Sequence, residues 1–187
     1  NSTLDRYQVR SLTLDVLTCI VLMMKLIPNP ASQEQVVIIR ANASHLDDVF
    51  ELNQGNVPAV GEVSRDWFEQ MLDTEGVQFR VKLVDNHVAG FYVAMRPGLN
   101  YKSLNYLWFC NRFDDFVYLD RIVVHSQYSR QGIGRDLYTF LRNENQSWAS
   151  RITCEVNVKP LNQASLDFHS RLGFQEVGQQ DTERGKK

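Results

Sequence analysis

The segment from Tyr118 to Tyr138 constrains the fold of this 187-residue chain more than any other. It starts with an apolar run that predicts a strand, continues through a loop with Gly132 and Gly134, and passes directly into a predicted helix. The first amides of a helix lack hydrogen-bond partners, and glycines let several N–H groups face one anion. The segment therefore predicts a strand–loop–helix unit that binds an anion such as a diphosphate.

Two well-known phosphate loops do not match this segment or any other part of the chain. The P-loop requires the pattern G-x-x-x-x-G-K-[ST], which the sequence lacks. The dinucleotide fingerprint requires a third glycine three residues after Gly134, where Leu137 stands. These mismatches exclude nucleoside triphosphatases of the P-loop class and dehydrogenases with that fingerprint.

Hydrophobic periodicity along the rest of the chain predicts both antiparallel strand pairs and strand–helix–strand crossovers. An early hairpin, followed by strand–helix–strand units, favours an α/β (α+β three-layer) domain with a mixed, mostly antiparallel central sheet and helices on both faces. Residues 96–115 are expected to form a long aromatic-rich connection. The pattern places strands at 36–39, 77–83, 88–95, 116–124, 152–158 and 174–177, and helices at 44–54, 64–76, 134–143 and 162–171.

The domain is expected to occupy residues 36–178, between an N-terminal extension at 1–35 and a polar tail at 179–187. The apolar run at 16–24 is shorter than the roughly 20 residues that a membrane-spanning helix needs. Pro28 and Pro30 end whatever element precedes them. Three readings of the extension stay open: a helix for packing or homodimerisation, an artificially added or mis-assigned leader, and a targeting signal.

The net charge and the cysteine content limit the binding partners that the sequence predicts. The net charge of −2 gives no basic footprint, so neither a nucleic acid nor a membrane is an expected partner. The three cysteines are widely spaced and form neither a disulfide framework nor a zinc pattern. No metal site is expected, and the cytoplasm is the expected location.

Two motifs together resemble the GNAT superfamily of acetyl-CoA-dependent N-acyltransferases. The loop Ser129–Gly134 is similar to its pattern [RQ]-x-x-G-x-[GA], and residues 162–174 are similar to N-x-x-A-x-x-F-Y-x-x-x-G-F. The departures are Ser129 for Arg or Gln, Ser165 for Ala and His169 for Tyr. The resemblance covers about residues 36–177, and the segments 51–60 and 113–116 resemble a bacterial subgroup of the superfamily.

The resemblance implies a sheet that splays between its fourth and fifth strands, with acetyl-CoA in the gap. It implies direct transfer of the acetyl group to a primary amine, small-molecule or peptidyl, in a ternary complex. It assigns acetyl-CoA binding to the end of the fourth strand, the glycine loop and the following motif: Val123, Val124, Ser129, Arg130, Gln131, Gly132, Ile133, Gly134, Arg135, Asn162, Ser165 and Phe168.

Amide formation needs a base for the amine and an acid for the departing thiolate. His169 stands at the position of the superfamily's usual acid, although a hydrogen-bonded, partly buried histidine is the structural alternative. Glu155 and Asp120 are the candidate bases because each lies inside an apolar strand, where a carboxylate is costly without a purpose or a partner. Arg121 and Arg151 offer ion pairing as the alternative explanation.

The acceptor is expected to bind between the first two helices and the aromatic connection. The main alternative function is a non-catalytic acyl-CoA-binding or regulatory module, because Ser129 and His169 depart from the residues that the superfamily usually has. An O-acyltransferase is the third possible function. The candidate acceptor residues are Asn53, Asn56, Trp67, Tyr106 and Trp108, with Asp114 and Asp115 to attract a cationic amine.

Overall fold

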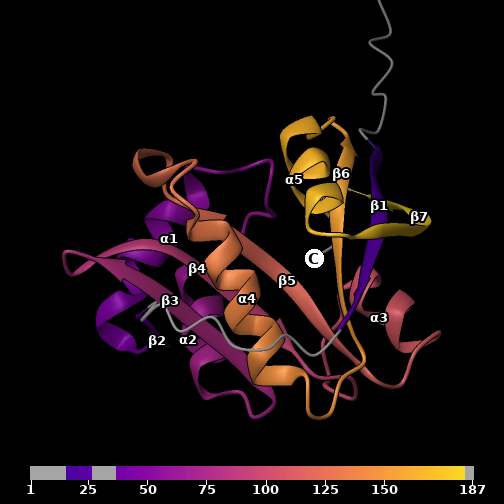
Figure 1. Ribbon diagram of the computed structural model, residues 1–187, viewed down its shortest axis with the longest axis horizontal. Coiled ribbons are helices and arrows are strands. Elements are labelled where there is room, and N and C mark those ends of the chain that lie inside the picture. The colour runs from indigo at the N-terminus through magenta and orange to yellow at the C-terminus, as the bar shows by residue number, and fades with distance from the viewer. Residues whose placement is uncertain (1–15, 27–36, 184–187) are drawn as a thin grey trace, which may run out of the picture.

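A computed structural model describes residues 16–26 and 37–183, and it shows one seven-stranded mixed sheet with helices on both faces (Figure 1). The strands follow the spatial order β2-β3-β4-β5-β6-β1-β7. This arrangement confirms the expected α/β three-layer class. The strands are β1 (Val16–Lys25), β2 (Ile38–Arg40), β3 (Val77–Val84), β4 (His87–Met95), β5 (Phe116–Val124), β6 (Arg151–Lys159) and β7 (Gln175–Glu183).

The helices divide between two hydrophobic cores, one on each face of the sheet. Helices α1 (Leu46–Gln54), α2 (Arg65–Asp73) and α3 (Leu104–Cys110) pack in one core, and α4 (Ile133–Asn145) and α5 (Gln163–Arg171) pack in the other. Short 3₁₀ turns cover Ala43–His45 and Ser126–Tyr128. None of the helices in the described residues is long and apolar enough to cross a membrane.

Local sequence signals explain several of these elements. The β3–β4 hairpin turns at Asp85 and Asn86, whose φ angles of 50° and 64° match the positive values that a tight hairpin turn requires. Helix α2 begins after Ser64, whose hydroxyl accepts a hydrogen bond from the Trp67 N–H at 3.1 Å. Helix α1 follows a 3₁₀ turn that Asn42 caps by accepting a hydrogen bond from the Ser44 N–H at 2.9 Å.

The expectation of a separate N-terminal extension, helical in one reading, is wrong for residues 16–25. They form β1, which lies between β6 and β7 and pairs antiparallel with both. An apolar run buried on both faces has no period that distinguishes a strand from a helix. Cys19 and Val21 face the core of α1–α3, whereas Ile20, Leu22 and Met24 face the core of α4 and α5. Residues 1–15 and 27–36 lie outside the described part.

Two further boundaries differ from expectation. Strand β7 continues to Glu183, so the sheet extends past the boundary at 178 because the polar end of β7 pairs with β1. Helix α3 forms inside the connection 96–115, where Ser103 caps it by accepting from the Tyr106 N–H. Both differences arise because hydrophobic periodicity alone does not identify the strand that pairs with β7 or the residue that caps α3.

The sheet opens between β5 and β6. The two parallel strands pair only where residues 116–118 meet residues 151–153, and they diverge beyond Tyr118 (Figure 1). This confirms the expected splay between the fourth and fifth strands of the domain. The second half of β5 therefore presents backbone groups to the opening without a strand partner on that side.

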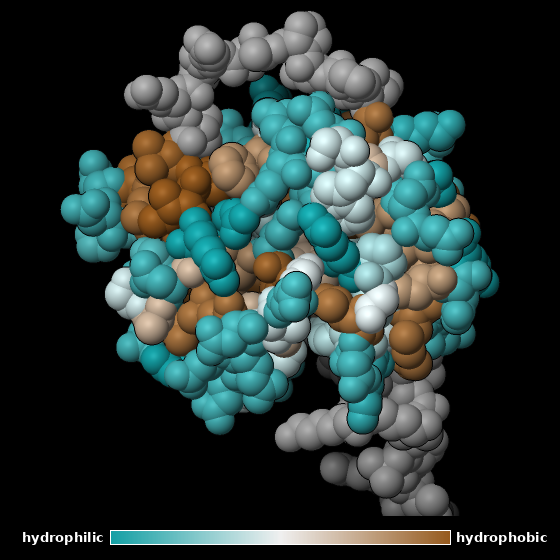
Figure 2. Space-filling model, turned by 90° about the horizontal axis from the view of Figure 1, so that it is seen from below, coloured by the Kyte–Doolittle hydropathy of each residue, from teal (hydrophilic) through white to brown (hydrophobic). Residues whose placement is uncertain are grey.

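The described surface carries scattered apolar side chains. Val37 and Ile39 lie at the β2 edge, and Leu104 and Leu107 lie on α3. Figure 2 shows hydrophobic residues in separate patches among hydrophilic ones on the face that it draws.

Candidate active site

A cavity of about 270 Å³ lies where β5 and β6 diverge, and we call it the central cavity. Five parts of the chain form it: the loop between α1 and α2, the second half of β5, β6, α4, and α5 with its N-cap residue. It brings together seven residues that the sequence singled out. The lining consists of Asn56, Ala59, Val60, Leu119, Arg121, Ile122, Val123, Val124, Tyr138, Cys154, Glu155, Asn162, Ser165 and His169.

The glycine loop leads from β5 into α4 and carries the geometry of an anion site. Gly132 is the N-cap residue of α4 with a φ of 86°, a left-handed conformation that favours glycine. The amides of Ile133, Gly134 and Arg135 have no hydrogen-bond acceptor among the described residues. Since the side chain of Ile133 is buried, this residue offers its amide alone. The loop can therefore hold an anion with backbone N–H groups.

Gly134 is needed for packing. A Cβ atom at this position would lie 3.0 Å from the ring of Phe168, so the glycine lets α4 approach α5 closely. Asn162 caps α5 by accepting a hydrogen bond from the Ser165 N–H at 3.1 Å. Of the expected cofactor residues near α5, Asn162 and Ser165 reach the central cavity, whereas Phe168 packs on Gly134.

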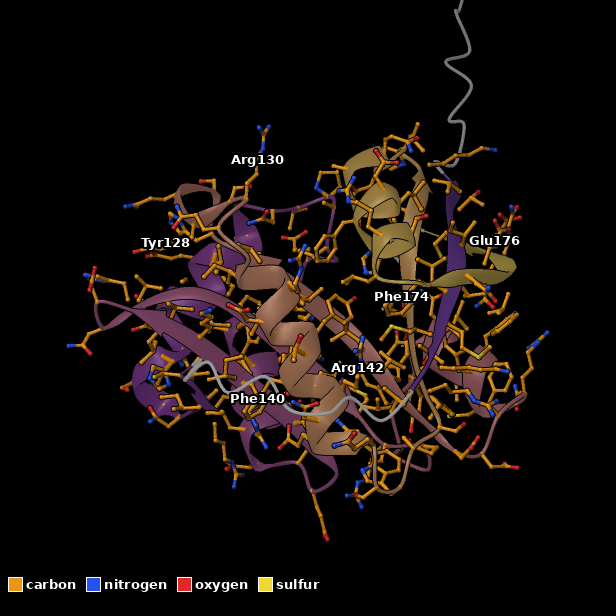
Figure 3. The ribbon with its side chains drawn as sticks, in the orientation of Figure 1. Tyr128, Arg130, Phe140, Arg142, Phe174 and Glu176 are labelled. Atoms are coloured by element: carbon orange, nitrogen blue, oxygen red, sulfur yellow. The ribbon has the colours of Figure 1, made fainter. Side chains whose placement is uncertain are left out.

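The loop's own side chains are exposed. Arg130 has a φ of 61° and projects away from the loop (Figure 3), and Ser129 and Arg135 are exposed as well. The side-chain amide of Gln131 donates to the carbonyl oxygen of Gln127 at 3.0 Å, and its backbone N–H donates to the carbonyl oxygen of Tyr128 at 3.4 Å. The cradle is thus formed by the backbone, with two arginines at its outer side.

Glu155 is one of the residues that line the central cavity. Its Oε1 accepts from the Tyr118 hydroxyl at 2.9 Å, and its buried Oε2 has no partner among the described residues. Burial and the nearby charge of Asp120 raise the pKa of Glu155 to about 8. A carboxyl group with this pKa is mostly protonated at neutral pH, and its ionised fraction, which grows as the pH approaches 8, can accept a proton.

Asp120 is engaged on both oxygens. Oδ1 accepts from the Tyr101 hydroxyl at 2.6 Å, and Oδ2 pairs with Nε of Arg121 at 2.9 Å. The same guanidinium donates to Asn53 Oδ1 at 3.0 Å and lies 4.2 Å from the centre of the Trp67 ring. Asp120 does not line the central cavity, so the geometry favours the ion-pair explanation for this carboxylate.

His169 is hydrogen-bonded at both ring nitrogens. Nδ1 lies 2.7 Å from the carbonyl oxygen of Ser165, and Nε2 lies 2.6 Å from the Tyr138 hydroxyl. Since a carbonyl only accepts, Nδ1 carries the proton of the neutral ring and Tyr138 donates to Nε2. Burial lowers the pKa of His169. In this neutral state the ring has no proton free for the cavity.

The sequence reasoning missed Tyr138. This residue stands four positions after Gly134, so helical spacing places it on the same face of α4 as the glycine that packs on α5. It is 1% exposed and lines the central cavity. The helical period was the signal that could have revealed it.

Among the expected acceptor residues, only Asn56 reaches the central cavity. Asn53 is fully buried beneath Arg121 and donates to the carbonyl oxygen of Gly61. Tyr106 is 1% exposed, and its hydroxyl donates to the carbonyl oxygen of Arg96 at 2.7 Å. Both side chains are structural because their polar atoms are already paired inside the protein.

The two tryptophans and the two aspartates expected at the acceptor site do not line the central cavity either. Trp67 stacks on Arg121, and Trp108 packs against Gly178 of β7. Asp114 and Asp115 precede β5 and so lie at the end of that strand remote from the cavity, where Asp115 pairs with Arg151 at 3.1 Å. The structure therefore does not bring these residues to the cavity. The tryptophan rings pack against the core, and the aspartates lie at the far end of β5.

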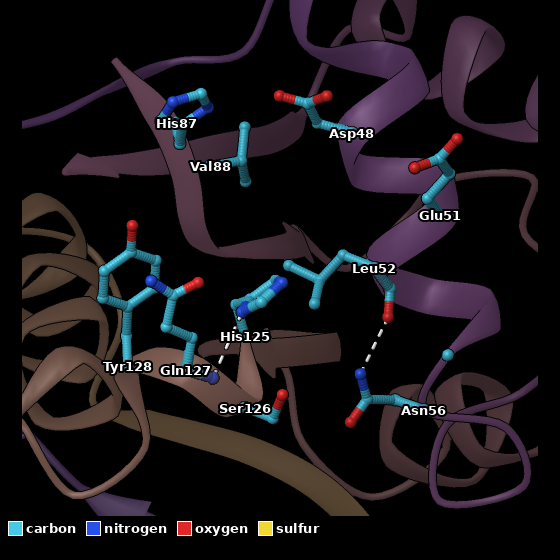
Figure 4. Close-up of a pocket in the computed structure, with 11 residues that line it drawn as sticks. Asp48, Glu51, Leu52, Asn56, His87, Val88, His125, Ser126, Gln127 and Tyr128 are labelled. Carbon is cyan, nitrogen blue, oxygen red and sulfur yellow. Dashed lines mark hydrogen bonds between the residues drawn. The ribbon is translucent and has the colours of Figure 1, made fainter. Parts of the chain in front are cut away.

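A second cavity, of about 640 Å³, lies between α1, the start of β4 and the turn after β5 (Figure 4). Asp48 and Glu51 reach it from α1, and His87 and His125 reach it from the strand ends. Asn56 lines both cavities. Within the described residues no group of three or more His, Cys, Asp or Glu side chains is arranged to hold a metal.

Comparison with known proteins gives one family match. The family model described as acetyltransferase (GNAT) family matches residues 46–174, which is more than half of the chain. No curated protein matches the sequence. The matched range starts at α1 and ends after α5, so it contains the glycine loop and the central cavity.

Solved structures share the fold at low sequence identity. The protein smu.2055 from Streptococcus mutans UA159 is 22% identical with a TM-score of 0.59, covering 74% of this chain and 83% of its own. The aminoglycoside N-acetyltransferase AAC(6')-Iy, in complex with CoA, is 17% identical with a TM-score of 0.61, covering 81% and 100%. The ribosomal-protein-S18-alanine N-acetyltransferase from Escherichia coli is 20% identical with a TM-score of 0.55, covering 73% and 76%.

Proposed function

The chain belongs to the acetyltransferase (GNAT) family, and from this membership we propose that it transfers the acetyl group of acetyl-CoA directly to a primary amine in a ternary complex. Family membership confirms the resemblance of the loop 129–134 and the segment 162–174, and it makes the protein an acyltransferase. The observation that carries the proposed chemistry is Glu155, whose pKa is raised to about 8, in the lining of the central cavity beside the unpaired edge of β5.

The residues present fit acetyl-CoA. The free amides of Ile133, Gly134 and Arg135 would hold its diphosphate, and the unpaired backbone at Val123 and Val124 would hold its pantetheine arm. When bound, acetyl-CoA supplies a thioester, whose carbonyl a β5 amide in the opening can polarise. The neighbouring structure of AAC(6')-Iy holds CoA, which supports the same cofactor here.

Glu155 is the proposed general base. Its carboxylate, once ionised, can accept a proton from the attacking amine, and a pKa of about 8 sets the pH at which half of the chains carry this base. Only the deprotonated carboxylate can do this, so the fraction of chains with a competent base rises with pH up to about 8. Asp120 then serves to hold Arg121, and through it the loop between α1 and α2.

The acceptor is proposed to reach the cavity beneath that loop. Asn56, Ala59 and Val60 form this part of the lining, and Asn157 donates to the carbonyl oxygen of Pro58 at 3.0 Å across the cleft. The names of two structural neighbours describe an aminoglycoside and an alanine of a ribosomal protein as acceptors. A small-molecule or peptidyl primary amine is therefore the proposed acceptor class.

A panel of amines separates this proposal from a non-catalytic acyl-CoA-binding module. Release of free thiol from acetyl-CoA should become amine-dependent for at least one polyamine, aminosugar or peptide in the panel. Saturable binding of acetyl-CoA without thiol release for any amine would favour the binding module.

A further inference from the structure

The departing thiolate needs a proton, and the central cavity holds two side chains that can deliver one. We propose that Tyr138 protonates the coenzyme A thiolate and that His169 supplies the proton through it. This inference rests on the proposed acetyl transfer. It assigns the catalytic hydroxyl to α4, whereas His169 on α5 acts from behind it.

The geometry pairs the tyrosine with the histidine in the wall of the central cavity. Tyr138 and His169 are 1% and 5% exposed, and both line the central cavity together with Glu155. The hydroxyl of Tyr138 lies 2.6 Å from Nε2 of His169, and Nδ1 is held by the Ser165 carbonyl at 2.7 Å. Both ring nitrogens are thus engaged, with Nδ1 also 3.2 Å from the Ser165 hydroxyl, and a proton on Nε2 can pass directly to Tyr138.

The direction of the Tyr138 hydrogen bond depends on the charge of His169. Beside the neutral ring, Tyr138 donates to Nε2, so its hydroxyl hydrogen is engaged by the histidine. When the ring is protonated, Nε2–H donates to the tyrosine oxygen and Nδ1–H still donates to the Ser165 carbonyl. The hydroxyl hydrogen of Tyr138 is then free to point at a thiolate in the cavity.

Each proton that moves during the transfer has a named donor and a named acceptor. The amine nitrogen forms the new bond to the carbonyl carbon, and its proton goes to Glu155. The carbon–sulfur bond breaks with its electron pair on sulfur, and the sulfur takes the proton of Tyr138. Tyr138 takes the Nε2 proton of His169, which is left neutral. Solvent returns a proton to His169 and removes one from Glu155 after the products leave.

Several ionisable groups share the cavity wall with His169. Among the described residues they are Tyr138 on α4, Arg121 on β5, and Cys154 and Glu155 on β6. The Cys154 thiol does not compete as an acid, because burial raises its pKa well above the usual value. Burial lowers the pKa of His169 below 6.5, so the protonated ring becomes scarcer as the pH rises above that point.

The test compares the wild-type chain with Tyr138→Phe over a range of pH, with one accepted amine and saturating acetyl-CoA. At acidic pH the variant should be slower by about 10²-fold, the usual contribution of a general acid. The ratio of the two rates should then fall by about tenfold per pH unit above the pKa of His169, because the wild-type advantage needs the protonated ring. Other titrations, including that of Glu155, affect both proteins and cancel in the ratio.

His169→Gln provides the second variant, since its amide can still bond Tyr138 but cannot carry a proton. It should show the same loss and the same decline of the ratio. Tyr92→Phe is the matched control, because Tyr92 is also fully buried and its hydroxyl bonds Glu144 away from the cavity. Its ratio to the wild type should stay near one at every pH.

A ratio that is large but independent of pH would show that Tyr138 is structural, and a ratio near one would remove it from the reaction. Either result would overturn this inference while the wild type still acetylates its amine. If the wild-type chain releases no thiol with any amine, the proposed function itself fails. Acetyl-CoA affinity, measured for each variant by calorimetry, confirms that the site is folded.

Discussion

Glu155→Gln should make the protein more stable, by an amount that grows with pH. Burial holds the pKa of Glu155 at about 8, against 4.5 for the ordinary side chain. Between these two values the folded chain keeps a proton that the unfolded chain releases. The free energy of unfolding therefore falls by about 1.4 kcal/mol per pH unit as the pH rises. The stability that this protonated carboxyl contributes is fully present below 4.5 and is lost as the pH rises through 8.

The glutamine variant lacks this titration but keeps an oxygen for the Tyr118 hydroxyl. From about pH 5 to about pH 7 its advantage over the wild type should grow by about 3 kcal/mol. Water that reaches the cavity would bring the pKa of Glu155 closer to its ordinary value, so the stability difference would grow over a narrower pH range. The growth per pH unit within that range would be the same. Urea unfolding of both proteins, followed by circular dichroism at several pH values, measures the difference. A stability difference that does not change with pH would refute the raised pKa and with it the reason for choosing Glu155 as base.

Three further substitutions test the cradle, the buried ion pair and the first strand. Gly132→Val should weaken acetyl-CoA binding by at least about tenfold in calorimetry, because a β-branched residue is strained at a φ of 86°. Gly98→Val, at a φ of 91° away from the loop, should leave the affinity unchanged. Arg121→Leu should cost about 3–5 kcal/mol in urea unfolding, since it leaves the Asp120 carboxylate buried without its cation; an unchanged stability would contradict that pairing. Leu22→Ala should cost about 2–5 kcal/mol if β1 lies inside the sheet, and nothing if it does not.

Features with a local cause could be predicted from the sequence. The hairpin follows from period-two alternation around Asp85 and Asn86, and the cradle follows from Gly132 at the junction of a strand and a helix. Ser64 caps its helix as its position suggests. Each of these signals is contained within a few residues, so no knowledge of distant contacts is needed.

Features with distant partners could not be predicted in the same way. Strand β1 pairs with strands more than 120 residues later, and an apolar run carries no sign of those partners. The choice between Glu155 and Asp120 depends on Tyr101, which comes from the connection before α3 and occupies one Asp120 oxygen. Tyr106 was expected at the acceptor site because of its chemistry, but its ring fills the core and its hydroxyl is paired.

The most direct test of the proposed function is the mass of the chain and of its products after incubation with acetyl-CoA. With acetyl-CoA alone, the intact mass of the protein should stay unchanged. After addition of an accepted amine, acetylated amine and free thiol should appear in equal amounts. A chain that gains the mass of an acetyl group before the amine is added would contradict direct transfer, and a chain that binds acetyl-CoA but acetylates no amine would contradict catalysis.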